Sequence, residues 1–324
     1  MILRPFLSNY PLTLVLIVPI IIVFQVLNIV YPFHTNFENI DLGLWGKTAI
    51  FTTNWSYIIS SIIIFFNAFQ INYLFNKHEF LDRNNYTPSL FYVVLMSFSH
   101  SFYQPDSILF SHVLLIQVIR ILFRLKGDEE DKQLMFNAAF LIGICATLLP
   151  TSSGFLGVLW ISAWALQAYS IRTWFITWLG FLTPIMNGLI FWWLSGHRIS
   201  TRILKHAGII QYETEIYVIT SITIFCLFLL SLIGIQIRTK ISNIRFKRLN
   251  RSLVWVLIGA LMFGSFELIY YKQGEWMSFV FIPLCIFFSY AFIHKLWRKV
   301  ATVFFYLALL NALLKFFLIS YIKV

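Results

Sequence analysis

Eleven apolar runs, separated by short polar or charged stretches, constrain the fold of this 324-residue chain more than any other feature. A run of about 17 to 25 apolar residues can cross a hydrocarbon core of about 30 Å as an α-helix. Lipid offers no partner to an unpaired backbone group, so the alternative to helices is a closed barrel, whose strands alternate apolar and polar residues. Runs such as 224–230 do not alternate. We therefore expect an all-α polytopic membrane protein, a bundle of about 11 transmembrane helices.

The boundaries of these runs predict the spans. We place them at about 12–31, 49–75, 88–103, 107–124, 134–149, 154–171, 173–194, 215–237, 252–271, 276–293 and 300–321. The runs at 88–103, 134–149 and 154–171 are short, so these segments either cross fully or are tilted or re-entrant. The intervening loops are too short for a soluble domain, so residues 1–324 form a single integral membrane domain.

The balance of charged residues excludes several classes of protein. Only 11% of the residues are charged, against about 25% in a typical soluble domain, so a soluble enzyme and a disordered chain are excluded. A net charge of +11 in a soluble protein would suggest nucleic acid. Here the cations lie in loops between apolar runs, where they orient the spans, and we expect no nucleic-acid partner.

The distribution of Lys and Arg predicts the orientation. With the N-terminus inside, 16 of the 24 cations fall in cytoplasmic stretches, six of them between residues 238 and 251, and six fall on the other side. Cytoplasmic loops are enriched in Lys and Arg. We expect a bacterial cytoplasmic (inner) membrane protein with a cytoplasmic N-terminus and a periplasmic C-terminus.

Acidic residues in two predicted outer loops are candidate catalytic groups. Glu38 and Asp41 lie in the loop after the first span, and Asp106 lies in the loop after the third. Carboxylates at an outer rim can act as a general base or bind a divalent ion. The alternative is that a short external loop simply needs polar residues.

A second outer feature is a row of cations. Arg198, Arg202 and Lys205 recur at i, i+4 and i+7, which is one face of a helix at the membrane interface. Arg binds phosphate with two parallel hydrogen bonds, so a polyprenyl-phosphate or phospholipid head group is the expected ligand. The alternative is contact with ordinary anionic membrane lipid.

Two charged residues fall inside predicted spans, where charge is costly. Glu267 and Lys315 each lie fifteen residues into an outward-running span, so they reach similar depths. One interpretation is an intramembrane ion pair. The other is that each side chain extends independently to the outer interface.

Other motifs indicate helix packing rather than chemistry. Span 173–194 contains Gly180, Pro184 and Gly188, which predict a kink and a close helix contact, and Ala139 and Gly143 form a small-residue pair. The seven His residues include no pair at i, i+3 or i, i+4. The chain also lacks glycine-rich phosphate-binding motifs, so we expect no metal and no cofactor.

Four segments resemble a family of multipass inner-membrane proteins from Bacteroidota for which no activity is established. These segments are 84–92, 136–143, 172–174 and 180–184, and the resemblance covers most of the chain. The implied fold is a helical membrane bundle, and no site residues are implied.

The chain is also similar to the membrane glycosyltransferase C superfamily. The similarity lies in a cytoplasmic N-terminus, acidic residues in the first external loop at Glu38 and Asp41, a second external carboxylate at Asp106, and external cations. It implies transfer from a polyprenyl-phosphate-linked glycan. The chain departs from that pattern in its short first loop, 32–47, and in lacking an adjacent acidic pair and an external domain.

Three function classes follow from these features. The first is a non-catalytic subunit or scaffold of cell-envelope biogenesis, in contact with membrane lipids and other membrane subunits. The second is a glycosyltransferase-C-like or ligase-type enzyme that acts on a polyprenyl-phosphate-linked glycan at the outer face. The third is a transporter of an anionic or lipidic solute, which requires a polar pathway at mid-membrane depth.

Overall fold

The computed structural model of the chain describes residues 2–31, 40–45, 47–48, 53–127, 131–166, 170–195, 214–271 and 275–322. Its helices are α1 (Leu3–Phe6), α2 (Ile17–Val30), α3 (Thr53–Lys77), α4 (Thr87–Met96), α5 (Ser107–Leu122), α6 (Asp131–Leu148), α7 (Phe155–Ala165), α8 (Ile171–Ser195), α9 (Thr214–Ile241), α10 (Ile244–Tyr271), α11 (Phe281–Phe288) and α12 (Lys295–Ile322). Short 3-10 helices are η1 (Pro11–Leu16), η2 (Gly43–Trp45), η3 (His100–Phe102), η4 (Pro150–Gly154), η6 (Glu275–Val280) and η7 (Ser289–Phe292).

β-Strand structure is confined, in the described ranges, to one two-stranded ladder. Strands β1 (Ile40–Asp41) and β2 (Lys47–Thr48) pair antiparallel, with Ile40 opposite Thr48 and Asp41 opposite Lys47. The expectation of an all-α protein is therefore confirmed.

Six of the described helical segments are long and apolar enough to cross a membrane. They are Pro11–Val30, Trp55–Lys77, Ile171–Leu194, Val218–Ile241, Ile244–Phe266 and Trp297–Phe317. Each of the eleven predicted ranges contains a helix. Four of these helices, α4, α5, α7 and α11, are shorter than the length of about 17 residues that a span requires. At 1.5 Å per residue, the ten residues of α4 cover about 15 Å of a core of about 30 Å. The number of crossings, about eleven, therefore stays a prediction.

Two predicted spans are broken. The range 88–103 was expected to form one helix, but α4 ends at Met96 and a non-helical segment with the 3-10 turn η3 follows. The range 276–293 is divided into η6, α11 and η7. Every residue of α4, and the stretch from Ile282 to Phe292, is buried. Longer helices surround these two short helices, which pack on each other through Phe91 and Phe288.

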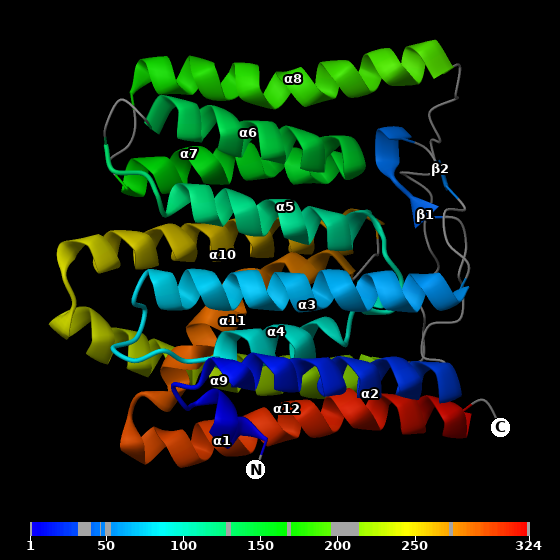
Figure 1. Cartoon of the computed structure of the whole chain (residues 1–324), viewed down its shortest axis with the longest axis vertical. Coiled ribbons are helices and arrows are strands. Elements are labelled where there is room, and N and C mark those ends of the chain that lie inside the picture. The colour runs from blue at the N-terminus through cyan, green and yellow to red at the C-terminus, as the bar shows by residue number, and fades with distance from the viewer. Residues whose placement is uncertain are drawn as a thin grey trace.

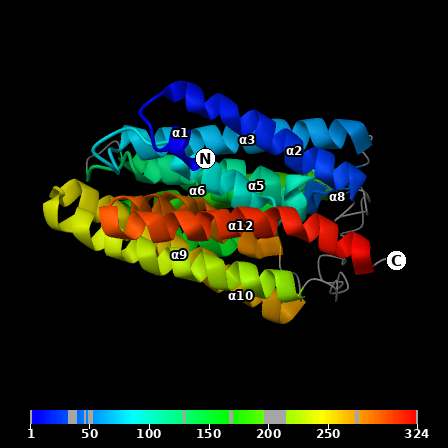
Figure 2. The same cartoon turned by 90° about the horizontal axis from the view of Figure 1, so that it is seen from below.

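The helices lie side by side in one bundle. Figure 1 shows α8 at one edge and α12 at the other, with α4 and α11 between longer helices. The C-terminal ends of α3, α5, α7 and α9, and the N-terminal ends of α4, α6, α8, α10 and α12, lie at one end. The α9–α10 turn at Ser242 and Asn243 extends furthest there in both Figure 1 and Figure 2. We call this end the hairpin end and the opposite end the far end.

The predicted small-residue contact joins α6 to α8. A Cβ atom on Gly143 of α6 would overlap the Phe181 carbonyl and the Pro184 ring of α8, and one on Gly180 would lie 2.6 Å from the Phe136 carbonyl. Only glycine permits so close an approach of the two backbones. The contact expected from the sequence is confirmed.

Helix α3 ends in a Schellman motif. The Phe80 N–H bonds to the Phe75 carbonyl at 3.2 Å, and the Glu79 N–H bonds to the Asn76 carbonyl at 3.1 Å. Phe75 and Phe80 stack with their ring centroids 5.5 Å apart. Glu79 holds a φ of +51°, which a residue with a Cβ atom adopts at a cost.

We therefore expect Glu79→Gly to raise the free energy of unfolding by about 0.5–1 kcal/mol, because glycine adopts this backbone conformation without strain. Thermal unfolding of the detergent-solubilised protein measures the change. Glu79→Ala is the matched control, since it removes the carboxylate but keeps the Cβ atom. An equal gain in Glu79→Ala would show that backbone strain is not the cause.

Candidate functional site: a polar lane beside Lys315

Helix α3 carries a row of polar side chains on its buried face, among apolar ones, and mostly apolar side chains on its exposed face. Ser56, Ser60, Asn67 and Gln70 are buried in the bundle, whereas the exposed positions of the same helix include Ile58, Ile62, Phe66 and Phe69. A soluble helix shows the reverse pattern. From Ser56 to Gln70 the polar face runs about 21 Å at 1.5 Å per residue. We call this face and its hydrogen-bond partners the polar lane.

The non-helical segment after α4 supplies backbone groups to the lane. Ser97, Ser99, Ser101, Tyr103 and Gln104 are all buried, although their backbone is not in a regular helix. In Figure 1, α4 ends short of the far end reached by α2, α3 and α12. Irregular backbone at membrane depth is tolerated where protein encloses it or where it lines a polar cavity.

Lys315 of α12 lies against this segment, and its side chain is fully buried. The amino group donates to the Ser97 carbonyl and to the Tyr103 hydroxyl, 3.0 Å away. It also lies 4.9 Å from the ring centroid of Phe98 and 4.8 Å from that of Phe316. A cation over aromatic faces is attracted by their quadrupoles. We call Ser97, Phe98, Tyr103 and Phe316 the lysine cage.

The lane and the cage are joined by hydrogen bonds. The Gln25 amide donates to the Phe102 carbonyl at 2.9 Å and to the Ser60 hydroxyl at 3.3 Å. The Ser60 hydroxyl lies 3.4 Å from the Tyr103 carbonyl. Three helices, α2, α3 and α12, therefore converge on the same broken segment.

A second group of polar residues continues the lane toward the hairpin end. The Asn67 amide donates to the Tyr92 hydroxyl at 3.1 Å, and that hydroxyl lies 3.1 Å from His112 Nδ1. His112 Nε2 lies 3.1 Å from the Ser278 hydroxyl. This chain links α3, α4, α5 and η6 through side chains that are all buried.

Several buried polar atoms along the lane have no hydrogen-bond partner within the described ranges. They include Gln25 Oε1, Asn67 Oδ1 and the Ser99 hydroxyl. A buried polar group without a partner costs about 1–3 kcal/mol, so proteins retain few of them. These atoms therefore keep hydrogen-bonding capacity that the described residues do not use.

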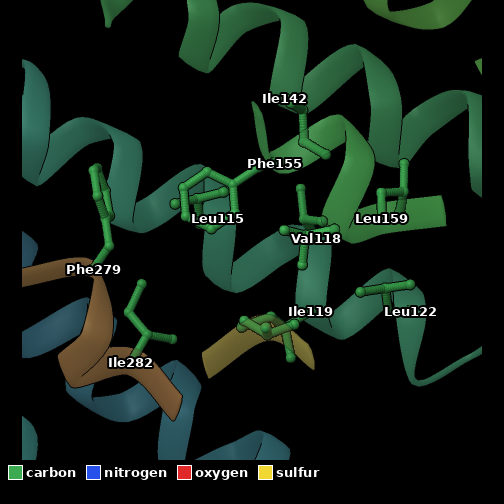
Figure 3. A pocket seen from close by; sticks show the side chains of 11 residues that line it. Leu115, Val118, Ile119, Leu122, Ile142, Phe155, Leu159, Phe279 and Ile282 are labelled. Atoms are coloured by element: carbon green, nitrogen blue, oxygen red, sulfur yellow. The ribbon is translucent and has the colours of Figure 1, made fainter. Parts of the chain in front are cut away.

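A small void elsewhere in the bundle is apolar. It has a volume of about 20 Å³ and lies among side chains of α5, α6, α7, α10 and the η6–α11 segment, including Leu115, Ile142 and Phe155 (Figure 3). A water needs two to four polar partners, which this lining lacks. The void is a packing defect and not a ligand site.

Of the predicted site residues, only Asp106 and Lys315 have side chains that the structure describes. Asp106 is the N-cap of α5: it accepts the Leu109 N–H at 2.8 Å and the Ser101 hydroxyl at 2.6 Å. This carboxylate therefore caps a helix, and its catalytic role stays a prediction. The remaining candidates are outside the described residues, either entirely or in their side chains: Glu38, Asp41, Arg198, Arg202, Lys205 and Glu267. The Glu267–Lys315 ion pair therefore stays a prediction.

Our sequence analysis missed most of the lane. Ser56, Ser60 and Asn67 recur at i, i+4 and i+11, which places them on one face of α3. This spacing was the pattern from which a polar helix face could have been predicted. The sequence analysis singled out Glu267 and Lys315 as the polar residues inside the spans and did not single out Gln25 and Asn67, whose amides are buried in the lane.

Comparison of the chain with protein-family models, characterised proteins and solved structures finds no match in any of the three.

Proposed function

We propose that the protein is a transporter of a small anionic solute, and that Lys315 is the charge which the solute meets inside the bundle. The supporting observation is the complete burial of Lys315 against a broken helix. Ionisable residues at membrane depth are rare because they are costly, and they commonly mark ion or substrate pathways. An amino group held by a carbonyl, a hydroxyl and aromatic rings can exchange these partners for an anion.

The broken helices support the same proposal. Transporters form their binding sites from discontinuous helices near mid-membrane depth, and α4 and α11 are two short, buried helices at the centre of this bundle. The polar lane along α3 supplies side-chain hydrogen-bonding groups over about 21 Å. The unpartnered atoms of Gln25, Asn67 and Ser99 supply further contacts for a solute.

The charge distribution supports an orientation for this transporter. The loops with most of the Lys and Arg residues lie at the hairpin end, and positive residues favour the cytoplasmic side. We place the hairpin end in the cytoplasm of a bacterial inner membrane and the C-terminus in the periplasm. In this orientation the lysine cage lies in the periplasmic half of the bundle.

The two other function classes receive less support. A scaffold of envelope biogenesis does not need a fully buried lysine. A glycosyltransferase-C-like enzyme needs Glu38, Asp41 and the outer cations to converge, and the one described carboxylate of that set, Asp106, caps a helix.

Proteoliposomes test the transport proposal. Concentration jumps of chloride, formate, acetate, lactate, phosphate and sulfate are applied to protein on a solid-supported membrane, with protein-free liposomes as the control. We expect a saturable current from at least one of these anions. Currents no larger than those of protein-free liposomes for the whole panel would overturn the proposal.

A further inference from the structure

A pocket at the hairpin end has features of a second site. It has a volume of about 540 Å³ and lies between the end of α3, the α3–α4 link and the α9–α10 turn. Its lining includes three cations, Lys77, Arg238 and Arg245, and two carboxylates, Glu79 and Asp82. We call it the hairpin pocket.

The three cations have different roles. Arg238 forms an ion pair with Asp82 at 2.5 Å and lies over the Phe246 ring at 5.6 Å, so it holds the α9–α10 turn against the α3–α4 link. Lys77 and Arg245 form no ion pair with any residue in the described part of the chain. Their side chains are exposed; the Lys77 amino group lies over the Tyr73 ring at 5.3 Å, a contact that leaves its charge without a carboxylate partner in the described residues.

The imidazole of His78 also lines the pocket but does not add to its positive charge. Burial, together with the charges of Arg245 and Lys77, lowers the pKa of His78 from 6.5 to about 4. His78 is therefore neutral at pH 7, and the available positive charge comes from Lys77 and Arg245.

The two carboxylates lie beside these cations. Asp82 forms the ion pair with Arg238, but its side chain remains 83% exposed and can accept a second partner. Glu79 is exposed and makes no ion pair within the described residues. A ligand with only negative charge would be repelled by Glu79 and Asp82, whereas a ligand with both signs would satisfy both sets of groups.

Apolar residues border the same pocket. Ile241 lines it and is 79% exposed, and Ile244, which follows the turn, is 69% exposed. Phe246 and Leu249 form the buried side of the lining. Exposed isoleucines at the end of a membrane helix fit acyl chains, which a free phosphate lacks.

We propose that the hairpin pocket binds the head group of a phosphoethanolamine lipid. The phosphate lies between Lys77 and Arg245, and the ammonium lies at Glu79 and Asp82. The acyl chains run along Ile241 and Ile244. This site is distinct from the polar lane, so its test does not depend on transport.

Native mass spectrometry of the full-length protein with equimolar phosphatidylethanolamine, phosphatidylcholine and phosphatidylglycerol tests the proposal. Phosphatidylcholine keeps both charges but removes the ammonium N–H donors, and phosphatidylglycerol keeps only the phosphate. We expect phosphatidylethanolamine to bind about fivefold or more above either one, since only its head group offers both a phosphate and ammonium N–H donors for charge-assisted hydrogen bonds. The proposal would be overturned if phosphatidylglycerol bound more strongly than phosphatidylethanolamine. It would also be overturned if inorganic phosphate displaced bound phosphatidylethanolamine as well as free phosphatidylethanolamine does.

Substitutions locate the binding. Lys77→Gln with Arg245→Gln should weaken phosphatidylethanolamine binding about tenfold, because both phosphate contacts are lost. The matched control is Lys240→Gln with Lys247→Gln, two exposed cations of the same hairpin outside the pocket. Glu79→Gln should reduce the preference over phosphatidylglycerol while total lipid binding is kept. Only variants that keep the melting temperature of the unsubstituted protein are compared. If the double variant Lys77→Gln with Arg245→Gln melts at a lower temperature, the single variant Arg245→Gln is used in its place. If the control pair weakens binding as much as the pocket pair, general surface charge explains the binding and the proposal fails.

Discussion

Lys315→Met is expected to abolish solute transport by the reconstituted protein, by about 100-fold or more, while its melting temperature stays unchanged or rises. Burying a charged amino group costs several kcal/mol, and methionine avoids that cost at a similar length. The Ser97 carbonyl keeps a partner after the substitution, because the Tyr103 hydroxyl donates to it at 2.8 Å. A thioether also packs well against the rings of Phe98 and Phe316. Transport currents and thermal unfolding in detergent measure the two effects.

The control for Lys315→Met is Lys299→Gln, an exposed cation on the same helix, which should change neither property. A melting temperature several degrees lower in Lys315→Met would show that Lys315 is a structural clip between α12 and the broken segment. Glu267→Gln in both backgrounds tests the remaining ion-pair prediction. Additive effects of the two substitutions on stability would exclude the pair.

Gly143→Ala is expected to lower the free energy of unfolding by about 1–3 kcal/mol. The added methyl group would overlap the Phe181 carbonyl and the Pro184 ring. Neither group can move by rotation of a side chain, so α6 and α8 must separate. The loss is expected even though alanine favours a helix by about 1 kcal/mol over glycine. Thermal unfolding in detergent measures it.

Gly157→Ala is the matched control. Gly157 lies in α7, and a Cβ atom there would meet nothing within 4 Å. This substitution should raise the free energy of unfolding by about 0.5–1 kcal/mol through helix propensity alone. If Gly143→Ala is as stable as Gly157→Ala, the close contact of α6 with α8 does not contribute to stability.

The sequence predicted the helices and one of their contacts because both depend on local patterns. Run length placed a helix in every predicted range. The spacing of Ala139 and Gly143, and of Gly180 and Pro184, predicted a close contact for each of the two helices, and the structure shows that α6 and α8 make it with each other. The break after Met96 was missed because the range 88–103 is apolar overall. The serines at 97, 99 and 101 alternate, and this alternation was the available sign that the helix ends.

The candidate site could be predicted only in part. The position of Lys315 within a span was visible, but its partners are a main-chain carbonyl and aromatic rings from a segment more than 200 residues earlier. Ser97 is the C-cap of α4, and carbonyls at a helix end lack intrahelical partners and accept from elsewhere. The cage therefore depends on a tertiary feature that no local pattern of residues specifies.

The shortness of α4 has a consequence for how the chain enters the membrane. Ten residues cannot cross the bilayer core, and the polar segment that follows exposes backbone groups that lipid does not satisfy. The segment finds partners on α2, α3 and α12, and α12 is synthesised after the other two. The break after α4 is therefore completed only when α12 enters the membrane, so a nascent chain that has not yet reached α12 contains an incomplete interior for membrane quality control to detect.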